Sequence, residues 1–367
     1  MRKRYYLIMF VIVTGLILGT LFFGGCSSTP VTEPQGAPKE ETAEQKPVEA
    51  PAKKVELSMA HFMSPKHVQQ EQVMEPFVAE VKEKTGGMVD ITIYPGAAMG
   101  KAADQYDNTM TGVIDIAYGL HGYTPGRFPM TSVMELPFMA TSGEHGSMML
   151  WELYNKFPEM KSEHPDVEVL WLWTHDVGQL LTTTKQVKTL EDMKGLKLRS
   201  PSATLNPMIE AWGATPVNMP ISELFEAMQR GIVDGTIVPL SAVHDFNLDE
   251  VVKYATVGDF YVATFFMAMN ENSFGKLSPG DQEIFKDMVG ERMVKKAAAA
   301  YDAGSQRGID ALIRRNIPTY TLPESELAKW KEAVEPLVEE WIKDKESKGL
   351  PGRQVYDEAM VLKEKLR

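Results

Sequence analysis

The sequence predicts an α/β protein whose strands and helices alternate around open, largely parallel sheets. The clearest evidence is Lys194–Leu240, where the pattern reads strand, helix, short strand, helix, strand. The same alternation recurs in Val55–Tyr118. Roughly 300 residues follow Lys54, which is long for a single core, so we expect two lobes.

Each element of the first half is predicted from its own pattern. Val55–Phe62 alternates apolar residues, as a half-buried strand does. A helix with Phe77 and Val81 on its apolar face follows, ends at Gly86-Gly87, and is kinked or started late by Pro76. The further elements are strands at Val89–Tyr94, Ile114–Tyr118 and Val167–Trp173, and helices at about 102–111 and around 150–157. Thr174–Thr183 is expected to carry the chain into the second lobe.

The second half begins with two amphipathic helices, which end at Gly213 and near Gly231. Two strands, Val251–Gly258 and Val262–Asn270, are expected to lead back, so that neither lobe is contiguous in sequence. Later elements are a long helix capped by Ser278-Pro279 and running to about Arg315, a brief strand at Pro318–Leu322, a helix containing Leu327 to Trp341, and a last helix at about 354–365.

The N-terminus has the pattern of an export signal. Positive residues at 2–4 precede a mostly apolar run, and small residues precede Cys26, which predicts a signal peptide over residues 1–25. Cys26 is the single cysteine, so disulfides are excluded, and its position resembles a lipobox in which it becomes lipidated. An uncleaved membrane anchor is the alternative. Residues 26–54 then form a polar, Pro- and Glu-rich tether, and the body lies outside the cytoplasm.

Composition and motifs narrow the function. The formal net charge of −12 argues against a nucleic-acid surface. The chain contains no nucleophile elbow, zinc-protease helix, phosphate loop or EF-hand run. We therefore predict a protein that is not an enzyme and that needs no cofactor or metal.

Arg199 is the main candidate site residue. It ends a short apolar strand directly before Ser200-Pro201, where the backbone leaves the extended state. A planar guanidinium anchored there can bind a carboxylate in a bidentate manner. The alternative is a surface arginine or an internal ion pair. If Arg199 is buried between lobes, a ligand anion would supply its counter-charge as the lobes close.

Other candidates lie at or just after predicted strand ends, the edge where open α/β sheets bind ligands. They are His61, Tyr118, His121 and Tyr123 in the first lobe, and a structural role is equally open for each. Trp173, His175 and Asp176 lie in the crossing region and are interpreted as hinge or rim residues.

The segments DMKGLKLRSP and AWGATPVNMPISELFEAMQRGIVDG resemble the central signature of DctP-type solute-binding proteins of tripartite ATP-independent periplasmic (TRAP) transporters. The similarity extends from HFMSPKHVQQ through TGGMVDITIYPGAAMG and TGVIDIAYG to MNENSFGKLSP. It implies a type II periplasmic-binding-protein-like fold, with a ligand cleft between two α/β lobes and long C-terminal helices spanning both. The implied boundaries are 55–175 with about 259–285 for the first lobe, about 176–258 for the second, and about 286–367 for the helices.

The resemblance also implies site residues. Arg199 occupies the position of the family's carboxylate-binding arginine, and Ser202 a position that often presents a polar side chain to the ligand. Gln179 lies in the strand that often carries a second polar or basic contact, and its neutral amide favours one clamped carboxylate. Val238 replaces a ligand-facing asparagine, which disfavours sugar acids, and Ile221 replaces a phenylalanine found in several relatives.

The resulting hypothesis is an extracytoplasmic, lipid-anchored receptor that captures an organic acid and delivers it to an ion-gradient-driven TRAP permease. An apolar or aromatic monocarboxylate, or a 2-oxo or hydroxy acid, is favoured over a dicarboxylate. Three alternatives stay open: a ligand-binding sensory module for a receptor kinase, an ABC-type binding protein, and a secreted hydrolase.

Overall fold

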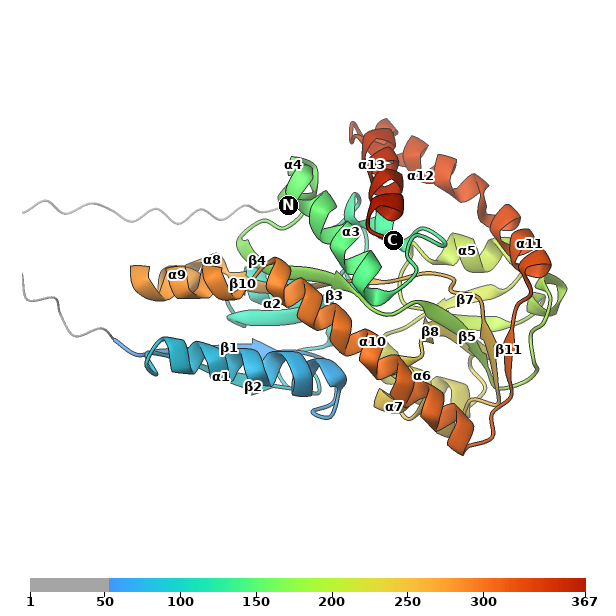
Figure 1. Cartoon of the computed structure of the whole chain (residues 1–367), viewed down its shortest axis with the longest axis horizontal. Coiled ribbons are helices and arrows are strands. Elements are labelled where there is room, and N and C mark those ends of the chain that lie inside the picture. The colour runs from blue at the N-terminus through green and yellow to red at the C-terminus, as the bar shows by residue number, and fades with distance from the viewer. Residues whose placement is uncertain (1–52) are drawn as a thin grey trace, which may run out of the picture. The chain divides into compact units, whose positions relative to one another are not determined.

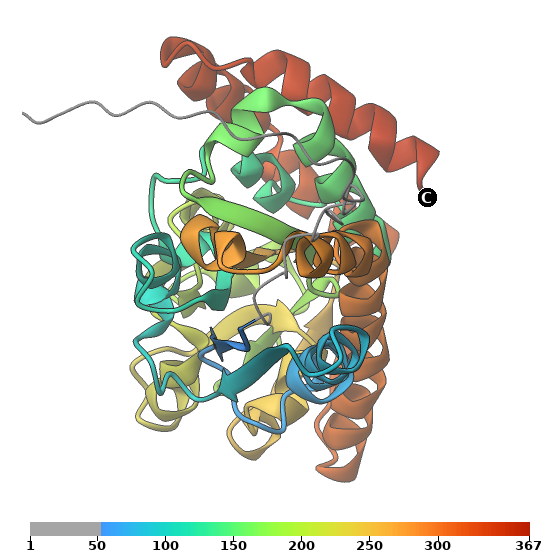
Figure 2. The same cartoon turned by 90° about the vertical axis from the view of Figure 1, so that its left-hand side faces the viewer.

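A computed structural model describes residues 53–367. The predicted signal peptide, Cys26 and nearly all of the tether lie outside the described residues. Within residues 53–367, no helix is long and apolar enough to cross a membrane. Figures 1 and 2 show the arrangement of helices and strands in two orthogonal views.

The first sheet has the strand order β2 (Val89–Tyr94), β1 (Val55–Ala60), β3 (Ile116–Leu120), β10 (Thr264–Asn270) and β4 (Val167–Thr174). β1 runs parallel to β2 and β3, which confirms the predicted parallel core. β10 arrives from a distant part of the sequence and pairs antiparallel with both β3 and β4. Every residue of β3 and β10 is buried, as expected of central strands covered on both faces.

The second sheet has the order β11 (Thr319–Thr321), β9 (Tyr254–Val257), β5 (Gly178–Thr182), β8 (Gly235–Pro239), β6 (Lys197–Ser200) and β7 (Thr215–Asn218). β6 is parallel to β7 and β8, whereas β5 is antiparallel to β8 and β9. The brief strand predicted at 318–322 thus adds an edge to this sheet, parallel to β9. The chain passes between the sheets at residues 175–177 and again at 258–263.

The helices of the body occupy the ranges that follow. They are α1 (Glu75–Lys84), α2 (Gln105–Met110), α3 (Gly143–Lys156), α4 (Pro158–Ser162), α5 (Asn206–Ala211), α6 (Ile221–Gln229), α7 (Ser241–Asp245), α8 (Glu271–Gly275), α9 (Pro279–Met288), α10 (Glu291–Arg314), α11 (Glu324–Val334), α12 (Pro336–Ser347) and α13 (Gly352–Lys365). Pro76 lies in the first turn of α1, and a short π-helical segment, η1 (Gln70–Met74), precedes it. Helical backbone already begins at Val68 and continues through η1 into α1, so the proline does not start the helix late. The irregularity before it is the π-helical segment itself.

Helix α10 joins the two halves. Its 24 residues extend over about 36 Å, and it contacts α3 and β4 on one side and α7 on the other (Figure 1). Two glycines permit the close approach of α7: a Cβ at Gly308 would lie 1.8 Å from the Leu240 carbonyl oxygen, and one at Gly304 would lie 3.0 Å from the Cβ of Ser241. The small residues therefore determine how closely α10 packs on the second lobe.

Two predicted helices are split in the structure. The helix expected from Ser278 to Arg315 is interrupted at Gly290, whose φ of +73° does not fit a helix, so α9 and α10 are separate. The helix expected across residues 327–341 is divided before Pro336 into α11 and α12. Ser278 caps α9 as predicted, because its hydroxyl accepts from the Asp281 N–H.

Candidate functional site

An apolar cavity lies between residues of the two sheets and of α10. It holds about 440 Å³ of non-atom space, including the part that opens to solvent. Aromatic side chains form much of the wall, including Phe62, Tyr118, Tyr123, Tyr261, Phe265 and Tyr301. Residues so distant in sequence meet because β10 pairs with β3 in the first sheet, and because α10 contacts both β4 of that sheet and α7 of the second lobe.

Arg199 supplies the permanent charge of this wall. It lies on β6 with 2% of its surface exposed. Its Nε donates to the Met219 carbonyl oxygen at 2.9 Å and its Nη2 to the Tyr123 hydroxyl at 3.1 Å. Within residues 53–367, no acidic side chain forms an ion pair with Arg199, and Nη1 has no hydrogen-bond acceptor. A buried guanidinium without a counter-charge is costly, which favours an anion at this point.

Tyr123 links Arg199 to the first lobe. It lies in the short helix η3 (His121–Tyr123), just after β3. Its hydroxyl oxygen accepts from Arg199 and also from the Ile221 N–H at 2.9 Å, the first N–H of α6. No described residue accepts the proton of this hydroxyl. Tyr123 and Arg199 therefore present two neighbouring donors that come from different lobes.

The two histidines of the wall add no charge at neutral pH. The Ala263 N–H donates to His175 Nε2 at 3.1 Å, so the proton of the neutral ring resides on Nδ1, next to the Asp176 carbonyl oxygen at 2.5 Å. Burial lowers the pKa of His175 to about 4. Burial also lowers the pKa of His67 to about 3, although Asp245 lies 3.7 Å away.

Of the residues singled out in the sequence, six line the cavity: Arg199, Tyr118, Tyr123, His175, Ile221 and Val238. Trp173 lies behind the wall, where its ring stacks on Phe265 at 5.7 Å between centroids. The ring of Tyr118 lies 5.1 Å from that of Trp173. Trp173 thus supports the wall instead of forming its surface.

His61, Gln179 and Ser202 have protein partners outside the cavity. His61 is buried, and its Nε2 lies 2.9 Å from the Gln70 side-chain oxygen. Gln179 donates to Asp259 at 2.6 Å and accepts from the Gly258 N–H. Ser202 donates to Glu135 of the first lobe at 3.0 Å, beside a small second cavity.

Sequence reasoning missed the wall residues supplied by β10, by the segment before it and by α10: Tyr261, Phe265 and Tyr301. Their patterns are those of ordinary core positions. These residues reach the wall because β10 returns antiparallel to β3. Local periodicity in the sequence does not reveal such a pairing.

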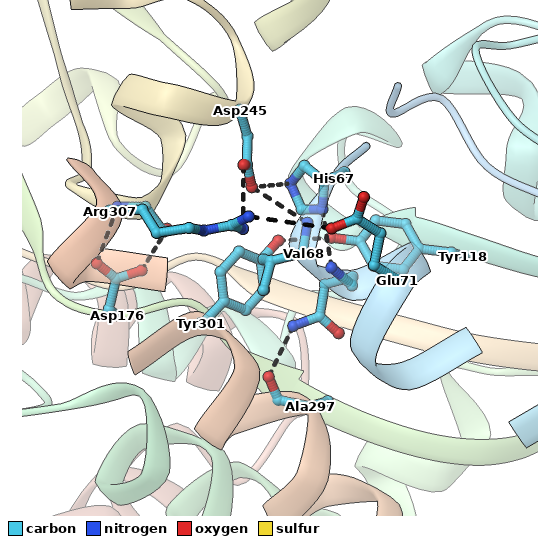
Figure 3. Close-up of polar contacts among 11 residues, drawn as sticks. His67, Val68, Glu71, Tyr118, Asp176, Asp245, Ala297, Tyr301 and Arg307 are labelled. Atoms are coloured by element: carbon cyan, nitrogen blue, oxygen red, sulfur yellow. Dashed lines mark hydrogen bonds and ion pairs between the residues drawn. The ribbon is translucent and has the colours of Figure 1, made fainter. Parts of the chain in front are cut away.

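A polar network connects the lobes behind the cavity (Figure 3). Asp245 of α7 accepts from the Val68 N–H at 3.3 Å and from Arg307 Nη2 of α10 at 3.2 Å. Asp176 of the crossing segment accepts from the hydroxyls of Ser241 in α7 and Ser305 in α10. α10 is thus hydrogen-bonded at the point where the chain passes from one sheet to the other.

The described residues contain no group of three or more His, Cys, Asp or Glu side chains that could hold a metal ion. The site consists of a buried guanidinium, tyrosine hydroxyls and aromatic rings between two α/β lobes. Such an arrangement is typical of a protein that binds a small molecule between two lobes.

The family model described as bacterial extracellular solute-binding protein, family 7 (DctP), matches residues 59–344. The chain belongs to this family, as the sequence resemblance predicted, and it is a solute-binding receptor of the TRAP type. Proteins of this family are extracytoplasmic receptors and are not enzymes. The predicted two-lobed α/β fold is confirmed by the solved structures that the chain resembles.

Three of these structures are informative. A TRAP solute-binding protein from Rhodoferax ferrireducens T118, in complex with copurified benzoate, is 31% identical, with a TM-score of 0.82 and coverage of 85% of this chain and 98% of that one. A marine metagenome protein specific for aromatic acids, with 3-hydroxybenzoate, is 30% identical, with a TM-score of 0.82 and coverage of 86% and 99%. A Bordetella bronchiseptica protein with bound mandelate is 26% identical, with a TM-score of 0.80 and coverage of 85% and 100%.

Proposed function

We propose that this receptor binds an aromatic monocarboxylate whose carboxylate is held by Arg199 and Tyr123. The observation that carries the proposal is the buried guanidinium of Arg199, which faces an aromatic cavity and has no acidic partner among the described residues. A carboxylate would accept from Nη1 and from the Tyr123 hydroxyl, both charge-assisted contacts in a region of low dielectric. The aromatic acids bound by the three similar structures support this ligand class.

The composition of the wall supports a ring over a sugar or a short diacid as the ligand. Val238 and Ile221 offer no hydrogen bonds beside the arginine, so the hydroxyls of a sugar acid would be buried without partners there. Phe265 and Phe62 present ring edges and faces that pack well against another aromatic ring. No second cationic side chain lines the described wall, which leaves the second carboxylate of a diacid uncompensated.

Capture also couples to closure in this proposal. Tyr123 belongs to the first lobe and Arg199 to the second, so one carboxylate bonded to both donors stabilises the arrangement in which the lobes meet. The closed receptor would then deliver its ligand to a TRAP permease driven by an ion gradient. Lipidation at Cys26 would hold it at the membrane, and mass spectrometry of the mature N-terminus tests that part separately.

Calorimetric titration of the purified protein with benzoate, mandelate and succinate tests the ligand class. We expect saturable binding of at least one aromatic acid and much weaker binding of succinate. Tight binding of succinate with no binding of either aromatic acid would refute the proposal. A permease knockout that leaves uptake of the bound acid unchanged would favour a sensory role.

A further inference from the structure

A pair of tyrosine hydroxyls forms a second polar point in the cavity wall. Tyr118 of β3 and Tyr301 of α10 both line the cavity, and their hydroxyl oxygens lie 2.7 Å apart (Figure 3). One hydroxyl donates to the other, whichever way the bond is oriented. The accepting tyrosine keeps its own O–H proton, and no described residue accepts it. The pair therefore has one donor and several lone pairs to spare in a buried place.

Two other polar side chains of the wall, Tyr261 and His175, already have protein partners. The Tyr261 hydroxyl donates to the Ile237 carbonyl oxygen at 3.2 Å, and both ring nitrogens of His175 have backbone partners. An unused donor in a buried site costs free energy unless a partner fills it. The spare proton of Tyr118 and Tyr301 thus marks a position where a ligand group gains by accepting a hydrogen bond.

The hydroxyl pair is set apart from the carboxylate donors by one aromatic residue. The ring of Phe62 lies 5.4 Å from that of Tyr123 and 5.6 Å from that of Tyr118, measured between centroids. The Phe62 ring thus contacts the rings of both Tyr123 and Tyr118. A ligand with a ring between its carboxylate and its second polar group matches this order.

The electrostatic surroundings favour a neutral second group. Burial raises the pKa of Tyr301, and the nearby acidic groups Asp176 and Asp245 raise it further, while its bond to Tyr118 has the opposite effect. The hydroxyls therefore stay protonated at physiological pH. Burying a second carboxylate beside these acidic groups is unfavourable, whereas a phenolic hydroxyl carries no charge.

We infer that the ligand is a hydroxy-substituted aromatic monocarboxylate, and that Tyr118 and Tyr301 determine this specificity by hydrogen-bonding its hydroxyl. The inference rests on the proposed function and adds the second recognition point to it. The ligand hydroxyl accepts the spare proton of the pair and donates to the lone pair of a tyrosine oxygen. An unsubstituted or methylated ring fills the same space but leaves the donor unpaired.

Titration with isosteric ligand pairs tests this inference on the purified protein. The pairs are 3-hydroxybenzoate with 3-methylbenzoate, and 4-hydroxybenzoate with 4-methylbenzoate. We expect the hydroxylated member of at least one pair to bind roughly tenfold more tightly, the value of one well-placed hydrogen bond. In the double variant Tyr118→Phe, Tyr301→Phe that ratio should fall to about one, because neither hydroxyl remains.

Tyr261→Phe is the matched control, since it removes another hydroxyl from the same wall whose proton is already donated to the backbone. It should keep the preference, and the methylated ligands should bind the double variant about as tightly as the wild type. Equal binding within both pairs, or a preference that persists in the double variant, would overturn the inference while leaving the carboxylate clamp intact. Failure of all four acids to bind would overturn the proposed function as well.

Discussion

Replacing Arg199 by methionine should separate ligand affinity from stability. Methionine preserves much of the volume but removes the charge that the ligand carboxylate would meet. Losing one partner of a buried, hydrogen-bonded charge pair typically weakens binding by about 2–5 kcal/mol, which corresponds to at least a thirtyfold increase in Kd. The variant also loses two bonds, to the Met219 carbonyl and to the Tyr123 hydroxyl.

The stability of the unliganded protein should change little. The variant loses those two hydrogen bonds, but it also loses the cost of burying a cation that has no acidic partner. We expect the free energy of unfolding to change by less than about 2 kcal/mol. Arg307→Met is the contrasting variant: Arg307 pairs with Asp245, whose side chain is 1% exposed, so its removal leaves a buried carboxylate with less compensation. Calorimetry and urea unfolding measure both quantities. Unchanged affinity in Arg199→Met, or a loss of stability as large as in Arg307→Met, would refute the clamp.

Three further predictions concern the clamp, the long helix and the crossing segment. Tyr123→Phe should weaken binding of an aromatic carboxylate roughly tenfold in calorimetry, since one donor is lost; an unchanged Kd would exclude it from the site. Gly308→Ala should lower the free energy of unfolding by about 1–3 kcal/mol through its clash with α7, whereas Gly275→Ala, with nothing within 4 Å, should not. Burial raises the pKa of Asp176 to about 7 from its ordinary value of 3.8. Between about pH 4 and 7 the folded protein keeps this proton whereas the unfolded chain has lost it. The free energy of unfolding therefore falls as the pH rises through this range. Asp176→Asn should gain stability relative to wild type across this window in urea titrations, and a difference independent of pH would contradict the assignment.

Local signals determined much of the fold, and for that reason they could be read from the sequence. Arg199 was placed correctly at the end of a strand, because alternating apolar residues and the following Ser-Pro are both local features. The two helix breaks at Gly290 and before Pro336 were also visible as breaker residues. The prediction nevertheless continued each helix through its breaker residue, because apolar periodicity is present on both sides of it.

The wall of the cavity could not be predicted in the same way. Phe265 and Tyr301 reach it only because β10 returns to the first sheet and α10 passes beside both lobes. Ser202 and Gln179 point instead to Glu135 and Asp259, partners that are distant in sequence. Hydrogen bonds between such segments depend on the assembled fold, and the spacing of residues in the sequence does not predict them.

The walls of the cavity come from residues as far apart as Phe62 and Tyr301. A nascent chain, or one still being threaded across a membrane, has no complete pocket until nearly all of its length is available to fold. A ligand in the cytoplasm therefore cannot stabilise the folded state of an incomplete chain before export. Ligand binding becomes possible only after the segment that contains Tyr301 has folded onto the rest of the wall. Binding therefore begins when folding is nearly complete.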